Sequence, residues 1–427
     1  MRLRLLLPRS RRGRGLRGLA LASASVLLAA GCGGSSESSS VTAASVPTPA
    51  LPTPPTPKAP AAPRLGIGLT EFNANLLEHG DVSPAFAPWR DKVEALRPRW
   101  FRLVVTWDGA MPTPTTAPVF DHPEDGCVRG IPPCAPFSGV RSLLRAVASQ
   151  QHAHPGQWNL FVVLTYTPTW AAVGAHGCEP KGTEPRARPV DTEALPGYRN
   201  MIRSLLAEAR RDGAKVGALS PWNEPNHSSF ISPQRATCDA HAPLLSPAVY
   251  AKLAGAARDE LKGTKTRLVL GELAGKVAPS PLAGSVEEFV KALPDDVACS
   301  GAIWSQHMYT NLPSKPDLAG PVGQLERALD ARACTKGKPV WVTETGVGAD
   351  HPGRTRSSDP AQLEEGCHAQ AAALARWSRD PQVQNVFQYE FRDAPDFPVG
   401  VADDRLTRTY PVYEVYRRAS RQGKYSC

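Results

Sequence analysis

Residues 216–225 of this chain read VGALSPWNEP, an apolar strand-like run that stops at a glutamate, Glu224. A second string of the same design lies 120 positions later, where residues 339–346 read PVWVTETG and place Glu344 at the end of an apolar run. Paired carboxyl groups at strand ends suit the cleavage of a glycosidic bond, in which one group protonates the leaving oxygen and the other attacks. The two strings therefore predict a fold of repeated strands and an acid–base active site.

Apolar runs and helical patterns alternate on both sides of these strings, over residues 65–427. The strand candidates are 65–70, 100–107, 159–165, 216–222, 267–272, 301–308, 339–344 and 385–391. The helical candidates include 85–97, 411–420 and a stripe at the 3.6-residue period of a helix, formed by Tyr198, Met201, Ile202, Leu205, Leu206 and Ala209. Eight strand–helix pairs predict an α/β fold, a (β/α)8 TIM barrel that forms a single catalytic domain over residues 65–427.

A doubly wound open sheet is the competing architecture for alternating strands and helices. Such a sheet normally starts with a glycine-rich turn that binds a phosphate. Here Gly66 and Gly68 lack the third glycine and the helix start that would complete this turn. The barrel is therefore the favoured fold.

Residues 1–31 are predicted to be a signal peptide rather than part of the fold. Seven arginines precede an apolar run at 19–30, which is too short to span a bilayer. LAAGC at residues 28–32 resembles a bacterial lipobox, so we expect lipidation of Cys32 and an exported, cell-surface lipoprotein, with a plain secreted protein as the alternative. Residues 32–64 are rich in serine and proline, which predicts an extended linker.

The charge of the chain argues against a nucleic-acid partner. The formal net charge is +9, but residues 1–31 carry seven arginines and no acidic residue, which leaves +2 for residues 32–427. A nucleic-acid-binding domain would carry a strong basic stripe in its folded part. We expect no nucleic acid, membrane attachment only through the lipid anchor, and a monomer.

The order of the motifs resembles clan A of the glycoside hydrolases across residues 65–427. The strings FRLVVTW, LTYTPTW, WNEPN, HMY and VTETG occur at the second, third, fourth, sixth and seventh strand candidates. YTPTW and WNEPN are most similar to family 39, with family 5 and its relatives as rivals. The resemblance implies Glu224 as the general acid/base on strand four and Glu344 as the nucleophile on strand seven. The chain departs from many clan members at residues 388–391, which read QYEF where those proteins offer a tryptophan.

Other residues of these motifs are candidates for substrate binding. Asn223 is expected to hydrogen-bond the substrate hydroxyl next to the reacting carbon. Arg102 lies in the middle of a strand, where a charge needs a partner, and the resemblance places it beside Glu344. His307 and Tyr309 end strand six, and the resemblance implies a histidine near the site and a tyrosine hydroxyl near the nucleophile. A satisfied core histidine is the alternative for His307.

Three tryptophans and four acids lie near the predicted strand ends. Trp107, Trp170 and Trp222 have positions that suit the stacking of a sugar ring, although a buried core position is equally ordinary. Apolar neighbours such as Trp222 are also expected to disfavour the charged form of Glu224 and so keep its proton in place. The further acids that are candidates to bind sugar hydroxyls are Glu71, Asp108, Glu272 and, foremost, Glu390.

Other chemistries lack their motifs in this sequence. There is no H-E-x-x-H or C-x-x-C pair for zinc and no G-x-S-x-G nucleophile turn. Acid–base hydrolysis requires no cofactor, so we expect neither a cofactor nor a catalytic metal.

The eight cysteines other than Cys32 form an even set in an exported chain, which suggests disulfides. We pair the cysteines whose expected positions in the barrel lie close together. The predicted bonds are Cys127–Cys134, Cys178–Cys238, Cys299–Cys334 and Cys367–Cys427. The first two would stiffen the long loops on the catalytic face.

These patterns together predict a retaining O-glycosyl hydrolase that acts on an extracellular, β-linked glycan or oligosaccharide. A non-catalytic glycan-binding or cell-wall lipoprotein on a barrel scaffold is the alternative, because a fold alone does not prove activity. A solute-binding lipoprotein of a transport system would need two lobes and a hinge rather than eight repeated units.

Overall fold

The computed structural model describes residues 65–77, 84–131, 136–310, 320–348 and 356–427, and the structural statements below concern these residues. Parallel strands β1 to β8 close into a barrel in which each strand pairs with its neighbours in sequence. The strands are Gly66–Thr70, Trp100–Thr106, Asn159–Thr165, Val216–Ser220, Arg267–Leu273, Ile303–His307, Val340–Thr345 and Val383–Tyr389. Pairing of Gly66 with Asn385 begins the contact between β1 and β8 that closes the barrel.

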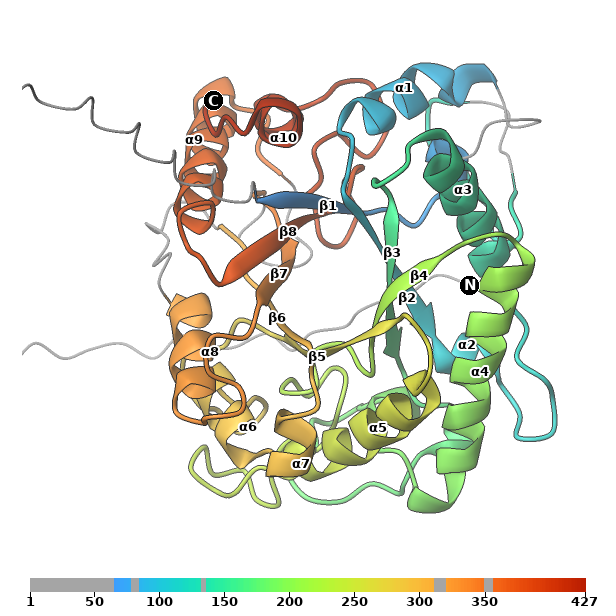
Figure 1. Cartoon of the computed structure of the whole chain (residues 1–427), viewed down its shortest axis with the longest axis vertical. Coiled ribbons are helices and arrows are strands. Elements are labelled where there is room, and N and C mark those ends of the chain that lie inside the picture. The colour runs from blue at the N-terminus through green and yellow to red at the C-terminus, as the bar shows by residue number, and fades with distance from the viewer. Residues whose placement is uncertain (1–64, 78–83, 132–135, 311–319, 349–355) are drawn as a thin grey trace, which may run out of the picture. The chain divides into compact units, whose positions relative to one another are not determined.

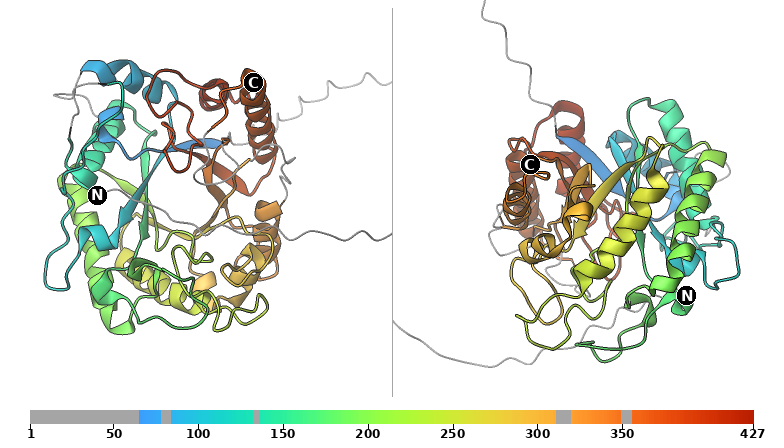
Figure 2. Two further views of the ribbon diagram at one scale, coloured as in Figure 1. Left: turned by 180° about the vertical axis from the view of Figure 1, so that it is seen from behind. Right: turned by 60° about the horizontal axis from the view of Figure 1, so that its bottom comes forward.

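Helices surround the barrel on its outside, as Figures 1 and 2 show. The α-helices α1 to α10 are Ala87–Ala95, Trp107–Ala110, Gly139–Ala153, Leu195–Arg211, Ser246–Leu261, Val286–Ala292, Asp295–Ala298, Gly320–Asp330, Pro360–Trp377 and Pro411–Gln422. Short 3-10 helices occupy Ala74–Leu76, Pro84–Phe86, Thr169–Ala171, Pro185–Ala187 and Thr192–Ala194. The predicted TIM barrel is therefore confirmed.

The sequence patterns located the elements well, with differences at their ends. All eight strand candidates overlap the observed strands, and the apolar stripe predicted between residues 198 and 209 is the buried face of α4. Strand β4 ends at Ser220, two residues before the predicted end at Trp222. Pro221 follows directly, and a proline has no N–H to continue the hydrogen bonds of a strand.

The core has an outer and an inner part. The outer part packs the helices against the strands. The inner part lies inside the barrel and consists of Trp100, Phe161, Val163, Ala218, Val269, Ile303, Trp341 and Phe387. Trp100 and Trp341 lie with ring centroids 4.6 Å apart. These apolar side chains fill the inside of the barrel.

Disulfides connect three of the predicted cysteine pairs: Cys178–Cys238, Cys299–Cys334 and Cys367–Cys427. The first joins the loops after β3 and β4, and the third fixes the C-terminal residue to α9. Cys134 and Cys32 lie outside the described residues, so the bond Cys127–Cys134 and the lipidation stay predictions. Within the described part of the chain, no helix has the length and apolar character needed to cross a membrane.

Candidate active site

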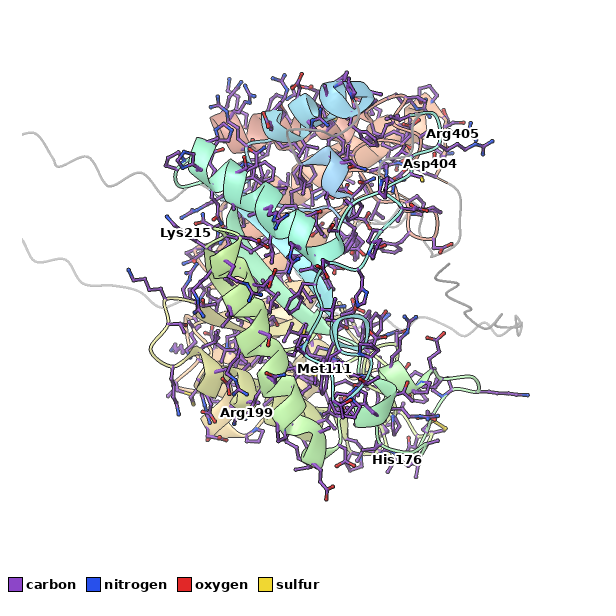
Figure 3. The ribbon with its side chains drawn as sticks, turned by 90° about the vertical axis from the view of Figure 1, so that its right-hand side faces the viewer. Met111, His176, Arg199, Lys215, Asp404 and Arg405 are labelled. Carbon is purple, nitrogen blue, oxygen red and sulfur yellow. A yellow bond between two sulfur atoms is a disulfide. The ribbon has the colours of Figure 1, made fainter. Side chains whose placement is uncertain are left out.

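The two faces of the barrel differ in the loops that they carry. Figure 3 shows Lys215, which directly precedes β4, on one side of the molecule, while Met111, His176, Asp404 and Arg405 lie in loops on the opposite side. These loops follow β2, β3 and β8, so this opposite side is the C-terminal face of the barrel. Active sites of TIM barrels are built at this face.

Glu224 and Glu344 meet at the C-terminal face. Glu344 belongs to β7, and Glu224 lies in the turn after β4 with a φ of +40°. Positive φ is rare for residues other than glycine and is held in place by surrounding contacts. Here the main-chain N–H of Glu224 donates to the carbonyl of Glu272 at 2.8 Å. One carboxyl oxygen of Glu224 and one of Glu344 lie within 4.8 Å of each other.

Arg102 connects the carboxyl groups at the centre of the site. Its side chain is fully buried in β2, and its Nε and Nη2 donate to Oε2 of Glu272 at 3.0 and 2.7 Å. Nη1 lies 2.8 Å from Oε1 of Glu344, and Nη2 also donates to the amide oxygen of Asn223 at 2.7 Å. The predicted placement of Arg102 beside Glu344 agrees with these distances. Its two carboxylate partners supply the compensation that a buried charge requires.

His307 lies between the same carboxyl groups and is 1 % exposed. Its Nδ1 is 2.8 Å from Oε1 of Glu224 and 3.3 Å from Oε2 of Glu344. Its Nε2 is 3.4 Å from Oε2 of Glu272. The structure therefore places His307 in the site rather than in an apolar core.

The proton of this group is held by His307. Burial opposes the charge of His307, but Glu344, Glu224 and Glu272 together raise the pKa of His307 to about 10. Burial likewise disfavours the charge of Glu224, yet the hydrogen bond and positive charge of His307 keep the pKa of Glu224 below its usual value. The expectation that Trp222 keeps Glu224 protonated is thus wrong for the unliganded site. Trp222 is 1 % exposed and its Nε1 donates to the carbonyl of Phe230.

Glu272 is a central residue of the site that the sequence marked only as an acid near a strand end. It is fully buried, and although burial favours its neutral form, the charge of Arg102 and the hydrogen bond to His307 lower the pKa of Glu272 to about 2. The preceding Gly271 has a φ of +105°, and a Cβ there would lie 2.2 Å from the carbonyl oxygen of Ser305. Glycine therefore lets β5 approach β6 where Glu272 enters the site. A glycine followed by an acid at a strand end is the signal that marks it.

Tyr309 contacts Glu344, as the resemblance implied, and the binding of a substrate hydroxyl by Asn223 stays a prediction. The hydroxyl of Tyr309 donates to Oε2 of Glu344 at 2.5 Å. Asn223 directly precedes Glu224, and its amide oxygen accepts from Arg102. Its amide nitrogen is the remaining hydrogen-bonding group of that side chain.

The tryptophans differ from one another in exposure. Trp107 is fully buried and lies edge-on to Trp170, 5.5 Å between centroids, and 5.4 Å from Tyr198. Its assignment to substrate binding is wrong, because its ring has no exposed face on which a sugar can stack. Trp170 is partly buried and its Nε1 donates to the carbonyl of Met111 at 3.0 Å.

Among the residues that the structure describes, two groups of side chains have the composition of a metal site. Glu224, His307 and Glu344 present three ligand atoms within 4.8 Å of one another, and these are the oxygen and nitrogen donors that divalent transition metals accept. When His307 carries its proton, its positive charge lies between the two carboxyl groups, where a metal ion would bind. The second group is Glu364, His368 and Cys427, but the Cys427 sulfur is used in a disulfide.

The chain is similar in fold to several solved structures. A family 39 glycoside hydrolase from the gut symbiont Bacteroides cellulosilyticus WH2 is 16 % identical with a TM-score of 0.51, over 85 % of this chain and 64 % of that one. SrfJ from Salmonella typhimurium is 12 % identical with a TM-score of 0.54, over 86 % and 76 %. An endo-β1,6-glucanase is 12 % identical with a TM-score of 0.52, over 86 % and 78 %.

These similarities show a shared fold. The chain spans less than two thirds of the family 39 enzyme, at 64 % of its length. No protein-family model matches the chain, and no curated protein matches it either. The fold that the resemblance to clan A implied is confirmed.

Proposed function

We propose that the chain is a retaining O-glycosyl hydrolase with Glu344 as nucleophile and Glu224 as general acid/base. The approach of their carboxyl oxygens to within 4.8 Å is the observation that carries this proposal. Retaining enzymes hold their two carboxyl groups about 5–5.5 Å apart, whereas inverting enzymes leave about 6.5–9.5 Å for a water molecule. The structural similarity to glycoside hydrolases supports a carbohydrate substrate.

In the first step, Glu344 attacks the anomeric carbon while the glycosidic oxygen leaves with a proton. Arg102 and Tyr309 contact the two oxygens of Glu344 and hold the carboxylate in one orientation. The departing proton comes from the Glu224–His307 pair, whose atoms are 2.8 Å apart. When a leaving oxygen reaches Glu224, the proton passes from Nδ1 of His307 to Glu224 and from there to that oxygen.

In the second step, water hydrolyses the ester between the sugar and Glu344. Glu224 is a carboxylate after it has given up its proton, so it acts as the base that takes a proton from the attacking water. The water oxygen bonds to the anomeric carbon, and Glu344 leaves as a carboxylate. The amide N–H of Asn223 donates to the hydroxyl beside the reacting carbon. This hydrogen bond strengthens as positive charge develops on the sugar.

Covalent trapping of the nucleophile tests the assignment of Glu344. The full chain is incubated with an activated 2-deoxy-2-fluoro glycoside, digested and analysed by peptide mass spectrometry. We expect one added glycosyl unit on the peptide that contains Glu344 and none in Glu344→Gln. A label on another carboxyl group, together with full activity of Glu344→Gln, would disprove the nucleophile.

Rescue by azide tests the assignment of Glu224. Glu224→Gln should turn over aryl glycosides with good leaving groups but lose on the order of 10²- to 10⁴-fold on poor leaving groups, because only the latter need a proton. Azide should restore the second step and yield a glycosyl azide of retained configuration. Equal losses for all leaving groups, without azide rescue, would contradict the acid/base role.

The place of the enzyme is a further part of this proposal. The lipobox-like string before Cys32 and the proline-rich linker support a lipid-anchored enzyme at the cell surface that acts on an extracellular glycan. Metabolic labelling with a clickable fatty acid should mark the chain, and Cys32→Ala should abolish the mark and release the protein to the medium.

A further inference from the structure

Glu390 is a buried carboxyl group to which the described part of the chain offers no hydrogen-bond or ion-pair partner. It directly follows β8 and is 7 % exposed. Among the residues that the structure describes, none donates a hydrogen bond to its carboxyl group or forms an ion pair with it; its main-chain oxygen alone accepts from Gln388 at 3.2 Å. Leaving a buried polar group unpaired costs free energy, so an unpartnered carboxyl group beside a catalytic site indicates a place for a ligand.

The neighbouring acid, Glu71, is fully engaged. Thr70 pairs with Tyr389 where β1 meets β8, so Glu71 and Glu390 follow adjacent strands. The carboxyl group of Glu71 accepts from the N–H groups of Phe72 and Asn73, each at 2.9 Å, and of Arg392 at 3.2 Å. Glu71 therefore has a role within the fold, and Glu390 is the acid of the two that is left for a substrate.

The side-chain hydrogen bonds that Arg392 and Arg356 make within the described part of the chain go to groups other than the Glu390 carboxyl group. The Nη1 of Arg392 donates to the carbonyl of Asp404 at 3.1 Å. Arg356 donates to Asp393 and to the carbonyl of Gly400, and its guanidinium lies 3.7 Å from the ring centre of Tyr410. Burial and the charges of Glu71 and Glu344 raise the pKa of Glu390 well above its usual value, with Arg392 acting against them. A further anion brought to this position would meet the carboxyl groups of Glu390 and Glu71, with the charge of Arg392 acting against their repulsion.

An aromatic group stands beside Glu390. Phe72 is 36 % exposed and lies edge-on to Tyr389 at 6.0 Å, and Phe397 lies 6.1 Å from Tyr389 and 4.9 Å from Tyr309. Tyr309 in turn bonds the proposed nucleophile. Aromatic rings offer an apolar surface to the C–H groups of a sugar, and a carboxyl group accepts from its hydroxyls. The group lies on the Glu344 side, where a retaining enzyme holds the sugar that becomes covalently bound.

We propose that Glu390 binds hydroxyl groups of the glycone at the end remote from the reacting carbon, and that it selects neutral glycones against hexuronic acids. This inference rests on the proposed hydrolysis, whose site it extends. A hydroxymethyl group donates a hydrogen bond to the Glu390 carboxyl group. A uronate carboxylate has no proton to donate and adds a third acid beside Glu390 and Glu71, so its binding requires one of these carboxyl groups to keep a proton.

Matched aryl glycosides test this selectivity in the full chain. A β-glucoside and β-glucuronide differ only at C6, as do a β-galactoside and β-galacturonide. We expect kcat/KM for the neutral member of the accepted pair to exceed that of the uronide by at least ~100-fold, since the uronide lacks the hydroxyl that donates to Glu390 and adds a third acid to the site. A uronide that is hydrolysed as well as the neutral sugar would overturn the proposal.

Variants assign the selectivity to Glu390. Glu390→Gln should reduce the ratio of neutral to uronide kcat/KM at least tenfold. Glu390→Asp keeps a carboxyl group but shortens the side chain, so it should lower kcat/KM for the neutral substrate and keep the uronide excluded. Glu365→Gln, an exposed position on the outer helix α9, is the matched control and should leave both values unchanged. An unchanged ratio in Glu390→Gln would disprove the role of this residue.

The proposed hydrolysis and this selectivity fail in different ways. If Glu344→Gln abolishes turnover but the neutral-to-uronide ratio does not depend on Glu390, only the selectivity is wrong. If no glycoside is turned over or trapped, the hydrolysis is wrong. Calorimetric titration of glucose and glucuronate into the native chain and Glu390→Gln then tests the subsite alone: a preference for glucose that Glu390→Gln removes supports it, and equal affinities overturn it.

Discussion

Glu272 and Glu390 are both buried carboxyl groups at the ends of barrel strands, yet their surroundings drive their ionisation in opposite directions. Glu272 accepts from Arg102 and contacts His307, and the pKa of its carboxyl group is lowered to about 2. Glu390 has the acids Glu71 and Glu344 around it, and its pKa is raised well above the usual value. Burial alone therefore does not decide the charge of a carboxyl group in this barrel; the presence of a directed cation does.

Arg102 is the cation that Glu272 and Glu344 share, and its removal should lower the stability of the protein most. Arg102→Met leaves Glu272 and Glu344 buried without compensation, so we expect the free energy of unfolding to fall by about 3–5 kcal/mol, measured by urea denaturation. Arg145→Met is the matched control, because Arg145 is 58 % exposed in its ion pair with Asp212, and such pairs contribute at most about 1 kcal/mol. Equal losses in both variants would show that burial does not distinguish the two pairs.

Neutralisation of Glu272 should destabilise the protein in a pH-dependent way. Because the pKa of Glu272 is about 2 in the fold against an ordinary 4.5, its ionisation stabilises the fold above pH 4.5, and this contribution is lost as pH falls toward 2. Glu272→Gln should therefore lose on the order of 3 kcal/mol at pH 7. Urea denaturation at several pH values should show this difference shrinking below about pH 4.5. A difference independent of pH would contradict the ionic role.

Removal of His307 should shift the activity profile toward acid. The proton needed by the leaving group is held on His307, whose pKa is about 10, so the native kcat/KM should persist well above neutral pH. In His307→Gln, Glu224 must hold the proton alone, so the basic limb of kcat/KM should move down by at least about one pH unit, a tenfold loss on that limb. A profile unchanged in shape and lowered uniformly would mean that His307 only supports the structure.

Neutralisation of Glu390 should change the free energy of unfolding least. The pH dependence of this change should have the opposite sign to that for Glu272. The raised pKa of Glu390 stabilises the fold below the ordinary value of 4.5, and this contribution is lost as pH rises through the folded-state pKa. Glu390→Gln should thus lie within about 1 kcal/mol of the native protein near pH 5 and become relatively more stable toward pH 8. Glu365→Gln should track the native protein throughout. A loss that grows with pH would indicate a cation at Glu390.

The sequence predicted what depends on short-range pattern. The strands and the buried stripe of α4 follow from periodicity over a few residues. Arg102 was expected to need a partner because a mid-strand charge cannot be left alone. Its partner Glu272 lies 170 positions away, a distance over which no spacing rule operates.

The errors arose where neighbours in sequence differ from neighbours in space. Trp107 follows a strand at the C-terminal face of the barrel, but its ring is fully buried and lies edge-on to Trp170. Trp222 was expected to set the proton of Glu224, whereas His307, 83 residues away, does so. A strand-end position indicates the end of the barrel, but it does not indicate the direction of the side chain.

The contact of His307 with both Glu224 and Glu344 has a consequence for the timing of the proposed reaction. Of the groups that raise the pKa of His307, Glu344 acts most strongly through its charge. When Glu344 becomes an ester, that charge disappears, and the pKa of His307 falls. Hydrolysis of the ester restores the charge, and with it the affinity for the proton that Glu224 takes from water. The covalent state of Glu344 thus controls how readily His307 gives a proton to Glu224.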